Sequence, residues 1–139
     1  MEPNIYDILK ESKTVAIIGC SKNKYRTSYH IASYLQEQGF KIIPIHPDYD
    51  EVLGEQAYDS ILNVPGDISI DIIDIFRDSA HTAEMVEEII EWSNKTGQQP
   101  VVWTQLGVSS DEAGEKAKEQ GLTYVAEKCL MVEHKKLQG

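Results

Sequence analysis

The chain has 139 residues, of which 41% are hydrophobic and 26% are charged, and its formal net charge at pH 7 is −10. This length suits one domain with a buried core, so we expect a single domain over residues 1–139. The acidic balance argues against nonspecific binding to nucleic acid or to anionic membranes, because both need positive potential.

Strand-like and helix-like patterns alternate along the chain. Apolar runs typical of strands cover 14–19, 41–45, 70–76, 100–105 and 122–126. Patterns typical of helices cover 4–10, 28–38, 82–95, 111–120 and 127–137. Gly39, Gly97 and Gly121 each follow a helical pattern, where glycine commonly ends a helix. The segment 48–65 predicts an irregular link with a short strand or a helical turn.

This alternation predicts the α/β class: a single doubly wound Rossmann-type domain with a five-stranded, mainly parallel sheet. We expect the third strand to lie beyond the second, and the fourth strand to separate the first from the fifth. Such sheets bind ligands beyond the carboxyl ends of their strands. The segments expected there are Gly19–Ser28, His46–Tyr49, Phe76–Ala80, Gln105–Val108 and Glu127–Cys129.

The turn after the first strand has the features of an anion site. Gly19 allows a sharp turn, and the amides of the following helix N-terminus suit a phosphate. Lys22, Lys24 and Arg26 place three positive charges in a short stretch of an acidic protein. Ser21 and Ser28 add hydroxyl donors.

An ordinary NAD site does not fit this turn. In the GxGxxG fingerprint the second and third glycines would stand where Ser21 and Lys24 are found. The acidic residue expected at the end of the second strand is replaced by His46, with Asp48 two residues further on. A P-loop is also excluded, because GxxxxGK[ST] does not occur.

Five short motifs occur at the expected strand ends: VAIIGCS (15–21), IPIHP (43–47), IFR (75–77), VWTQLGV (102–108) and KCLMVEH (128–134). In their order and spacing the chain resembles the small stand-alone CoA-binding proteins, whose Rossmann-type domain is similar to the N-terminal domain of the succinyl-CoA synthetase α subunit. The resemblance covers residues 5–137 and implies binding of coenzyme A, or of a CoA thioester, along the carboxyl edge of the sheet.

The resemblance also implies roles for individual residues. The backbone amides of Gly19, Cys20 and Ser21 would cradle the pyrophosphate, and Arg26 and Ser28 would approach the phosphates, next to the basic Lys22. His46 and Pro47 match a pair near the adenosine. Phe76 and Arg77 would flank the adenine or the pantetheine arm. Gln105 and Gly107 would lie along the path of the ligand.

The chain departs from the family pattern at three of these places. The family commonly has alanine where Cys20 stands, asparagine where His46 stands and lysine where Asp48 stands. The last departure concerns the 3′-phosphate of CoA, which a lysine would attract and an aspartate repels. Lys22, Lys24, Arg26 or a protonated His46 would have to compensate, and a dephospho ligand or a plain adenine nucleotide would tolerate Asp48 better.

The sequence offers little support for catalysis. The synthetase uses a phosphorylated histidine in a second domain, and no histidine of this chain matches it, so acyl-CoA ligation is not expected. Cys20 would lie near a helix N-terminus beside basic residues, which can lower a thiol pKa, but neither it nor Cys129 has an evident base partner. We expect no disulfide between them, because the tips of their strands would lie roughly 10 Å apart. No pair of histidines and cysteines has the spacing of metal ligands.

Three functions therefore remain open. The first is a non-catalytic CoA-binding protein, the second an NAD(P)-binding oxidoreductase or sensor, and the third a protein-interaction module with a vestigial nucleotide site. The chain start lacks the basic and apolar regions of a signal peptide, and no apolar run approaches the roughly 20 residues of a membrane helix. We expect a cytoplasmic protein, monomeric or homodimeric, with a small-molecule ligand.

Overall fold

The computed structural model describes residues 4–138. The helices are α1 (Ile5–Glu11), α2 (Thr27–Glu37), α3 (Ser79–Thr96), α4 (Asp111–Glu119) and α5 (Leu130–Gln138), with a 3-10 turn η1 (Ile61–Asn63). The strands are β1 (Thr14–Ile18), β2 (Lys41–Ile45), β3 (Glu51–Val52), β4 (Glu55–Gln56), β5 (Ile72–Ile75), β6 (Val101–Thr104) and β7 (Tyr124–Val125).

The main sheet has five strands in the order β2-β1-β5-β6-β7, all paired in parallel. The predicted α/β class with a five-stranded parallel sheet is confirmed. The predicted strand order is wrong, because the third long strand, β5, lies next to β1 and not beyond β2. This is the other common order of doubly wound sheets.

In this order β5 is a central strand. It pairs with β1 on one side and β6 on the other, and its four residues are all buried. The connection from β2 to β5 crosses back past β1. It contains the β3–β4 hairpin, whose tight turn has positive φ at Leu53 and Gly54, and the turn η1. The segment 48–65 was expected to be an irregular link with a short strand or a helical turn, and it holds two short strands and a 3-10 turn.

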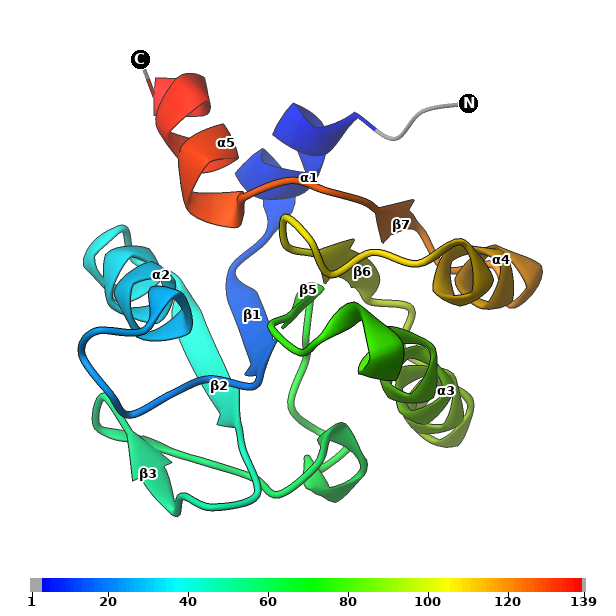
Figure 1. Ribbon diagram of the computed structural model, residues 1–139, viewed down its shortest axis with the longest axis horizontal. Helices are drawn as coiled ribbons and strands as arrows, with labels where there is room; N and C mark the ends of the chain where they lie inside the picture. Colours follow the sequence, from blue (N-terminus) through cyan, green and yellow to red (C-terminus); the bar gives the residue numbers. More distant parts are fainter. Residues whose placement is uncertain (1–3, 139) are drawn as a thin grey trace.

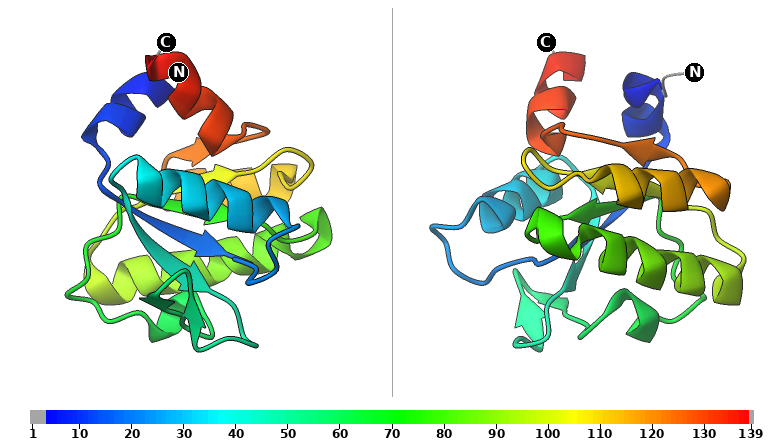
Figure 2. Two further views of the ribbon diagram at one scale, coloured as in Figure 1. Left: turned by 90° about the vertical axis from the view of Figure 1, so that its left-hand side faces the viewer. Right: turned by 45° about the vertical axis from the view of Figure 1, so that its right-hand side comes forward.

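Helices cover both faces of the sheet, which lies between two helical layers (Figures 1 and 2). The side chains of α3, α4 and η1 pack into one core cluster, and those of α1, α2 and α5 pack into the other. Helices α1 and α5 contact each other at the end of the molecule where the chain begins and ends (Figure 1). The carboxyl ends of β1, β5 and β6 lead through loops into the N-termini of α2, α3 and α4.

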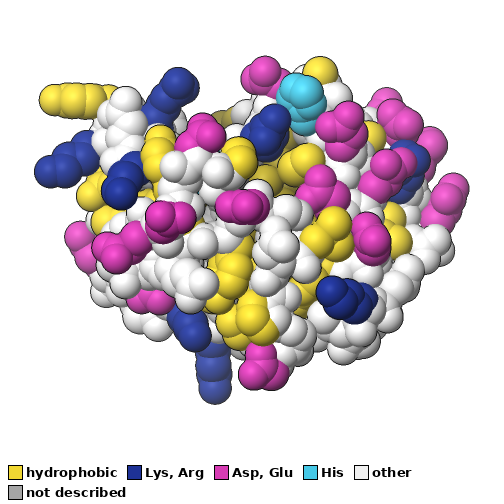
Figure 3. Space-filling model, turned by 90° about the horizontal axis from the view of Figure 1, so that it is seen from below, with side chains coloured by type: hydrophobic (Ala, Val, Ile, Leu, Met, Phe, Trp, Pro, Cys, Tyr) yellow, Lys and Arg dark blue, Asp and Glu magenta, His cyan; other side chains and the backbone are white. Residues whose placement is uncertain are grey.

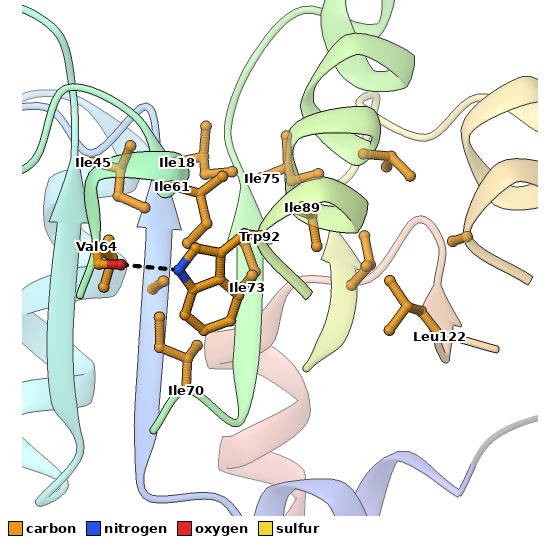
Figure 4. Packing of buried hydrophobic residues seen from close by; sticks show 14 of the residues in the cluster. Ile18, Ile45, Ile61, Val64, Ile70, Ile73, Ile75, Ile89, Trp92 and Leu122 are labelled. Carbon is orange, nitrogen blue, oxygen red and sulfur yellow. Dashed lines mark hydrogen bonds between the residues drawn. The ribbon is translucent and has the colours of Figure 1, made fainter. Parts of the chain in front are cut away.

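Trp92 anchors the core on the α3 side. Its indole is fully buried, and its Nε1–H donates a 3.0 Å hydrogen bond to the carbonyl oxygen of Val64, just after η1 (Figure 4). Ile61, Ile73 and Ile89 surround it with apolar side chains from three different elements (Figure 4). The hydrogen bond to Val64 fixes the β2–β5 connection against the sheet.

The helix ends follow the capping residues of the sequence. The hydroxyl of Ser110 accepts a hydrogen bond from the amide of Ala113 and caps α4. Gly97 ends α3 in the left-handed conformation, and its amide bonds back to the carbonyl of Ser93. In the described part of the chain no helix has the length and apolar character needed to cross a membrane.

Candidate functional site

The turn after β1 is packed directly against the end of β5. Gly19 has a φ of +84°, and a Cβ at this position would collide with the carbonyl oxygen of Phe76. The amide of Phe76 in turn donates a 2.8 Å hydrogen bond to the carbonyl of Ile18. Glycine is therefore required here by both the backbone conformation and the close approach.

The same turn is also bonded to the end of β2. The amides of Gly19 and Cys20 both donate to the carbonyl oxygen of Ile45, at 2.8 and 3.3 Å. The amide of Ser21 donates a 2.9 Å bond to the hydroxyl oxygen of Ser28. The three amides assigned to a pyrophosphate by the sequence thus have acceptors within the protein.

Other donors remain open beside this turn. The amides of Thr27 and Ser28 in the first turn of α2 have no acceptor among the described residues. The hydroxyl hydrogen of Ser28 is free to donate, because its oxygen acts as an acceptor in the bond from Ser21. Arg26 adds a permanent positive charge at the start of the helix.

A cleft of about 780 Å³ opens over the ends of β1, β2 and β5. It is lined by Gly19, Ser21, Asn23, Tyr25, Arg26, Thr27, Ser28, His46, Pro47, Asp48, Tyr49, Phe76 and Arg77. Segments from three separate parts of the chain therefore meet at one surface, as expected for the carboxyl edge of a parallel sheet.

A second hollow of about 670 Å³ continues this cleft toward the end of β6. The two share Thr27, Phe76 and Arg77. The rest of its lining is Asp78, Ser79, Ala80, Gln105, Leu106, Gly107 and Val108. The hollow includes the first residues of α3, whose N-cap Asp78 makes no side-chain capping bond. Together the two hollows form one elongated cleft.

Most residues proposed from the sequence line this elongated cleft. They are Gly19, Ser21, Arg26, Ser28, His46, Pro47, Phe76, Arg77, Gln105 and Gly107. Cys20 and Lys22 are not among the lining residues. Sequence reasoning did not single out Tyr25, Thr27 or Tyr49, although they lie in segments expected at the edge. Tyr25 is 94% exposed, and an exposed aromatic residue in a basic loop is the signal that could have identified it.

Positive charge is local on this acidic protein. On the face seen in Figure 3, lysine and arginine side chains gather at the upper left, while aspartate and glutamate side chains cover much of the right-hand part. Arg26 and Arg77 line the cleft itself, together with the carboxylates of Asp48 and Asp78. An anionic ligand would depend on these few cations and on backbone amides.

The tip of β2 carries a stacked pair of rings. The rings of His46 and Tyr49 lie 4.2 Å apart at an interplanar angle of 27°. The amide of Asp48 donates a 3.1 Å bond to Nδ1 of His46, so the neutral imidazole carries its proton on Nε2. The ammonium of Lys22 lies 5.8 Å from the centre of the Tyr49 ring. Lys22 thus reaches the ring pair at the tip of β2.

The thiol of Cys20 lies beneath the turn and not in the cleft. Cys20 is fully buried, and burial together with the nearby charge of Asp74 raises its pKa to about 12. The expectation that a helix N-terminus and basic neighbours would lower this pKa is therefore wrong, because desolvation outweighs them. Cys129 is partly buried, and both cysteines are free thiols.

Buried polar atoms under the cleft have no partner. They are both carboxylate oxygens of Asp74 and Oε1 of Gln105, within the described residues. Asp74 is opposite Trp103 in the sheet, and Gln105 lies two residues beyond Trp103, so both side chains project from the same face. Burial raises the pKa of Asp74 well above its ordinary value.

The fifth predicted segment, Glu127–Cys129, supports the cleft through bonds from Glu127 to the loop after β6. Glu127 accepts hydrogen bonds from the amide of Gly107 and from the hydroxyl of Ser109, at 2.6 and 2.7 Å. These bonds lower the pKa of Glu127, the Ser109 hydroxyl having the larger effect. Within residues 4–138 no group of three histidine, cysteine or acidic side chains is arranged to hold a metal ion.

The profile of the CoA binding domain family (CoA_binding_2) matches residues 13–135. The chain belongs to this family of CoA-binding domains. It is 36% identical over 130 residues to the uncharacterized protein YneT of Bacillus subtilis (strain 168), covering 94% of this chain and 91% of that protein. The resemblance expected from the five motifs is confirmed.

CoA-binding domains related to this chain occur alone and within larger proteins. A solved structure of a hypothetical protein from Pyrococcus horikoshii OT3 superposes with a TM-score of 0.87 at 38% identity, covering 97% of this chain and 90% of that one. The ADP-forming acetate–CoA ligase of Methanocaldococcus jannaschii is 31% identical over 125 residues, which cover 85% of this chain but only 17% of the ligase. The chain is therefore homologous to one part of that enzyme.

Proposed function

We propose that this CoA-binding domain binds coenzyme A or a CoA thioester in the elongated cleft, without catalysing a reaction on it. The observation that carries the proposal is the convergence of four family segments on one cleft at the carboxyl edge of the sheet. The pyrophosphate would lie at the start of α2, the adenosine at the tip of β2, and the pantetheine arm over the ends of β5 and β6.

The start of α2 offers the donors that a pyrophosphate needs. Two free amides and the hydroxyl of Ser28 lie at the positive end of an eleven-residue helix. Arg26 and Arg77 both line the same cleft, where each can offer its guanidinium to phosphate oxygens. This arrangement supports an anion with more than one negative charge.

The length of the cleft supports an extended ligand. The hollow beyond Phe76 and Arg77 is lined by both apolar and polar side chains, including Leu106, which is 62% exposed. Gln105 contributes an amide that can bond to the amide groups of a pantetheine arm. A plain mononucleotide would leave this second hollow unused.

The thiols of the chain support binding in preference to covalent catalysis. With a pKa of about 12 the buried Cys20 is protonated at neutral pH, and a thiol must ionise to act as a nucleophile. Nδ1 of His46 is taken by the amide of Asp48, and its ring stacks on Tyr49. The proposal therefore assigns His46 to ligand binding.

Thermal-shift titrations at low salt would test the proposed function. CoA, dephospho-CoA, acetyl-CoA, NAD and NADP would be compared, because a ligand that binds only the folded state raises the melting temperature with concentration. We expect CoA and acetyl-CoA to raise it more than NAD or NADP, and added salt to weaken the effect. Arg26→Gln should reduce the shift, while Lys95→Gln, at the far end of α3, should leave it unchanged.

Other results would support the alternatives. A larger shift with NAD or NADP than with CoA would favour the oxidoreductase or sensor function. No shift with any of the five compounds at millimolar concentration would contradict nucleotide binding. The interaction-module function would then be the one to pursue.

A further inference from the structure

The tip of β2 raises a question of charge that rests on the proposed function. Asp48 lines the cleft where the adenosine would lie, and its side chain is 78% exposed. Its carboxylate is 3.9 Å from Nδ1 of His46. A phosphomonoester on the ribose would be repelled by this carboxylate, so a ligand that carries one needs a cation from elsewhere in the fold.

The β1–α2 loop delivers such a cation. The bonds from Gly19 and Cys20 to Ile45 hold the beginning of this loop against the end of β2. Lys22 follows two residues later, and its ammonium lies over the face of Tyr49, 5.8 Å from the ring centre. Tyr49 lines the cleft and stacks on His46, so Lys22 is carried to the same corner as Asp48.

The charge of Lys22 is available for a ligand. No carboxylate among residues 4–138 forms an ion pair with it. Its contact with Tyr49 is a cation–π interaction, which orients the ammonium without neutralising its charge. Lys24, two residues further on, is also exposed and, like Lys22, is not a lining residue of the cleft, but it has no cation–π contact with this ring pair. The two lysines therefore differ in position while they share chemistry.

We propose that Lys22 is the specificity residue for a phosphomonoester on the ribose of the ligand. From the β1–α2 loop it supplies the positive charge that such a phosphate needs at the tip of β2, where Asp48 contributes a negative charge. The side chain lies on the Tyr49 ring and directs its ammonium at the phosphate. The chemistry fits the 3′-phosphate of CoA, and also the 2′-phosphate of NADP, so the test must separate these two sources.

Isothermal titration calorimetry of the full chain would test this assignment through affinity ratios. The ligands are CoA with dephospho-CoA, and NADP with NAD, each pair differing by one ribose phosphate. We expect the wild-type protein to prefer CoA to dephospho-CoA by about tenfold, the effect of one charge-assisted contact. Lys22→Gln should bring this ratio to one or below by weakening CoA alone, because the repulsion by Asp48 remains. Lys24→Gln is the matched control and should keep the wild-type ratio.

The opposing charge provides a second variant. Asp48→Asn should strengthen CoA binding about threefold to tenfold and change dephospho-CoA binding less, because only the first ligand carries the repelled phosphate. Both Lys22 and Asp48 have exposed side chains, so these substitutions are expected to leave the fold intact. Thermal melts without ligand would verify this.

Several results would overturn the assignment. Equal loss of CoA and dephospho-CoA affinity in Lys22→Gln would place Lys22 at the pyrophosphate. If the wild-type protein prefers dephospho-CoA, the Lys22 assignment is wrong and Asp48 accepts hydrogen bonds from free ribose hydroxyls. The proposed binding of a CoA-type ligand would still stand. A ratio that appears with NADP and NAD, and depends on Lys22, would support the phosphate contact while contradicting the proposed CoA function. Absence of binding by all four compounds would overturn both proposals.

Discussion

The amide of Gly107 donates a 2.6 Å hydrogen bond to the carboxylate of Glu127, which ties the loop after β6 to the loop after β7. Glu127 adopts a positive φ of 56°, a conformation that few residues other than glycine take. The second hollow of the cleft is therefore supported by a residue that does not line it.

Replacing Glu127 with glutamine should lower the melting temperature at pH 7, because a neutral amide accepts weaker hydrogen bonds than a carboxylate. Bonds from Ser109 and Gly107 lower the pKa of Glu127 from its ordinary value of 4.5. The carboxylate thus stabilises the fold fully above that value, and the stabilisation is lost as the pH falls through the lowered pKa. In thermal melts from pH 7 to 3, the melting temperatures of the variant and the wild type should become equal at low pH. Glu91→Gln should show no such convergence.

Gly19→Ala should destabilise the domain strongly. An alanine at this position would have to adopt a left-handed backbone conformation, which is unfavourable for residues with a Cβ. Its Cβ would also clash with the carbonyl of Phe76, which is fixed in the sheet. We expect a loss of at least about 2 kcal/mol in the free energy of unfolding, measured by urea denaturation. Gly39→Ala is the matched control, since its φ is +93° with no atom near the added Cβ. It should cost about 1 kcal/mol, and equal costs would contradict the packing argument.

Asp74→Asn should change the pH dependence of stability. The pKa of Asp74 is raised in the folded state, so the unfolded chain loses this proton first and folding becomes less favourable as the pH rises above the ordinary value of 3.8. Relative to wild type, the variant should gain roughly 1.4 kcal/mol per pH unit until folded Asp74 ionises. Urea denaturation at pH 5 and pH 7 would measure the difference. Parallel pH profiles would show that Asp74 is ionised in the fold.

Cys20 should resist alkylation in the native protein. At pH 8 a thiol with a pKa of about 12 is ionised in about one molecule in ten thousand, and the side chain is fully buried. In a Cys129→Ser variant, iodoacetamide labelling followed by mass spectrometry should be very slow and should accelerate in urea. Rapid labelling without denaturant would mean that Cys20 is accessible and reactive.

Local patterns predicted the elements well. The periodic apolar residues and the glycines at positions 39 and 97 predicted two helices over 28–38 and 82–95. The ends of these predicted helices differ by one to three residues from the observed ends of α2 and α3. The helix predicted over 111–120 also begins where expected, at Asp111, and Ser110 caps it. These features depend on neighbours in sequence, so one sequence is enough to find them.

Features that depend on distant residues were not predictable in the same way. Both doubly wound strand orders satisfy the same alternation of elements, and the placement of β5 between β1 and β6 is known only from the strand pairing in the structure. Asp74 lies within the apolar run 70–76, and only the packed structure shows that its carboxyl is enclosed without a partner. The contact of Lys22 with Tyr49 likewise depends on how β1 and β2 are joined, which local sequence does not encode.

The β1–α2 loop is restrained by hydrogen bonds between its own residues. Besides the two amides held by Ile45, the amide of Asn23 bonds to the hydroxyl of Ser21, and the amide of Tyr25 bonds to the side chain of Asn23. A loop restrained in this way has little conformational entropy to lose when it meets a ligand. Association would then be limited by diffusion and orientation and not by loop ordering, so differences in affinity among related ligands should lie in their dissociation rates.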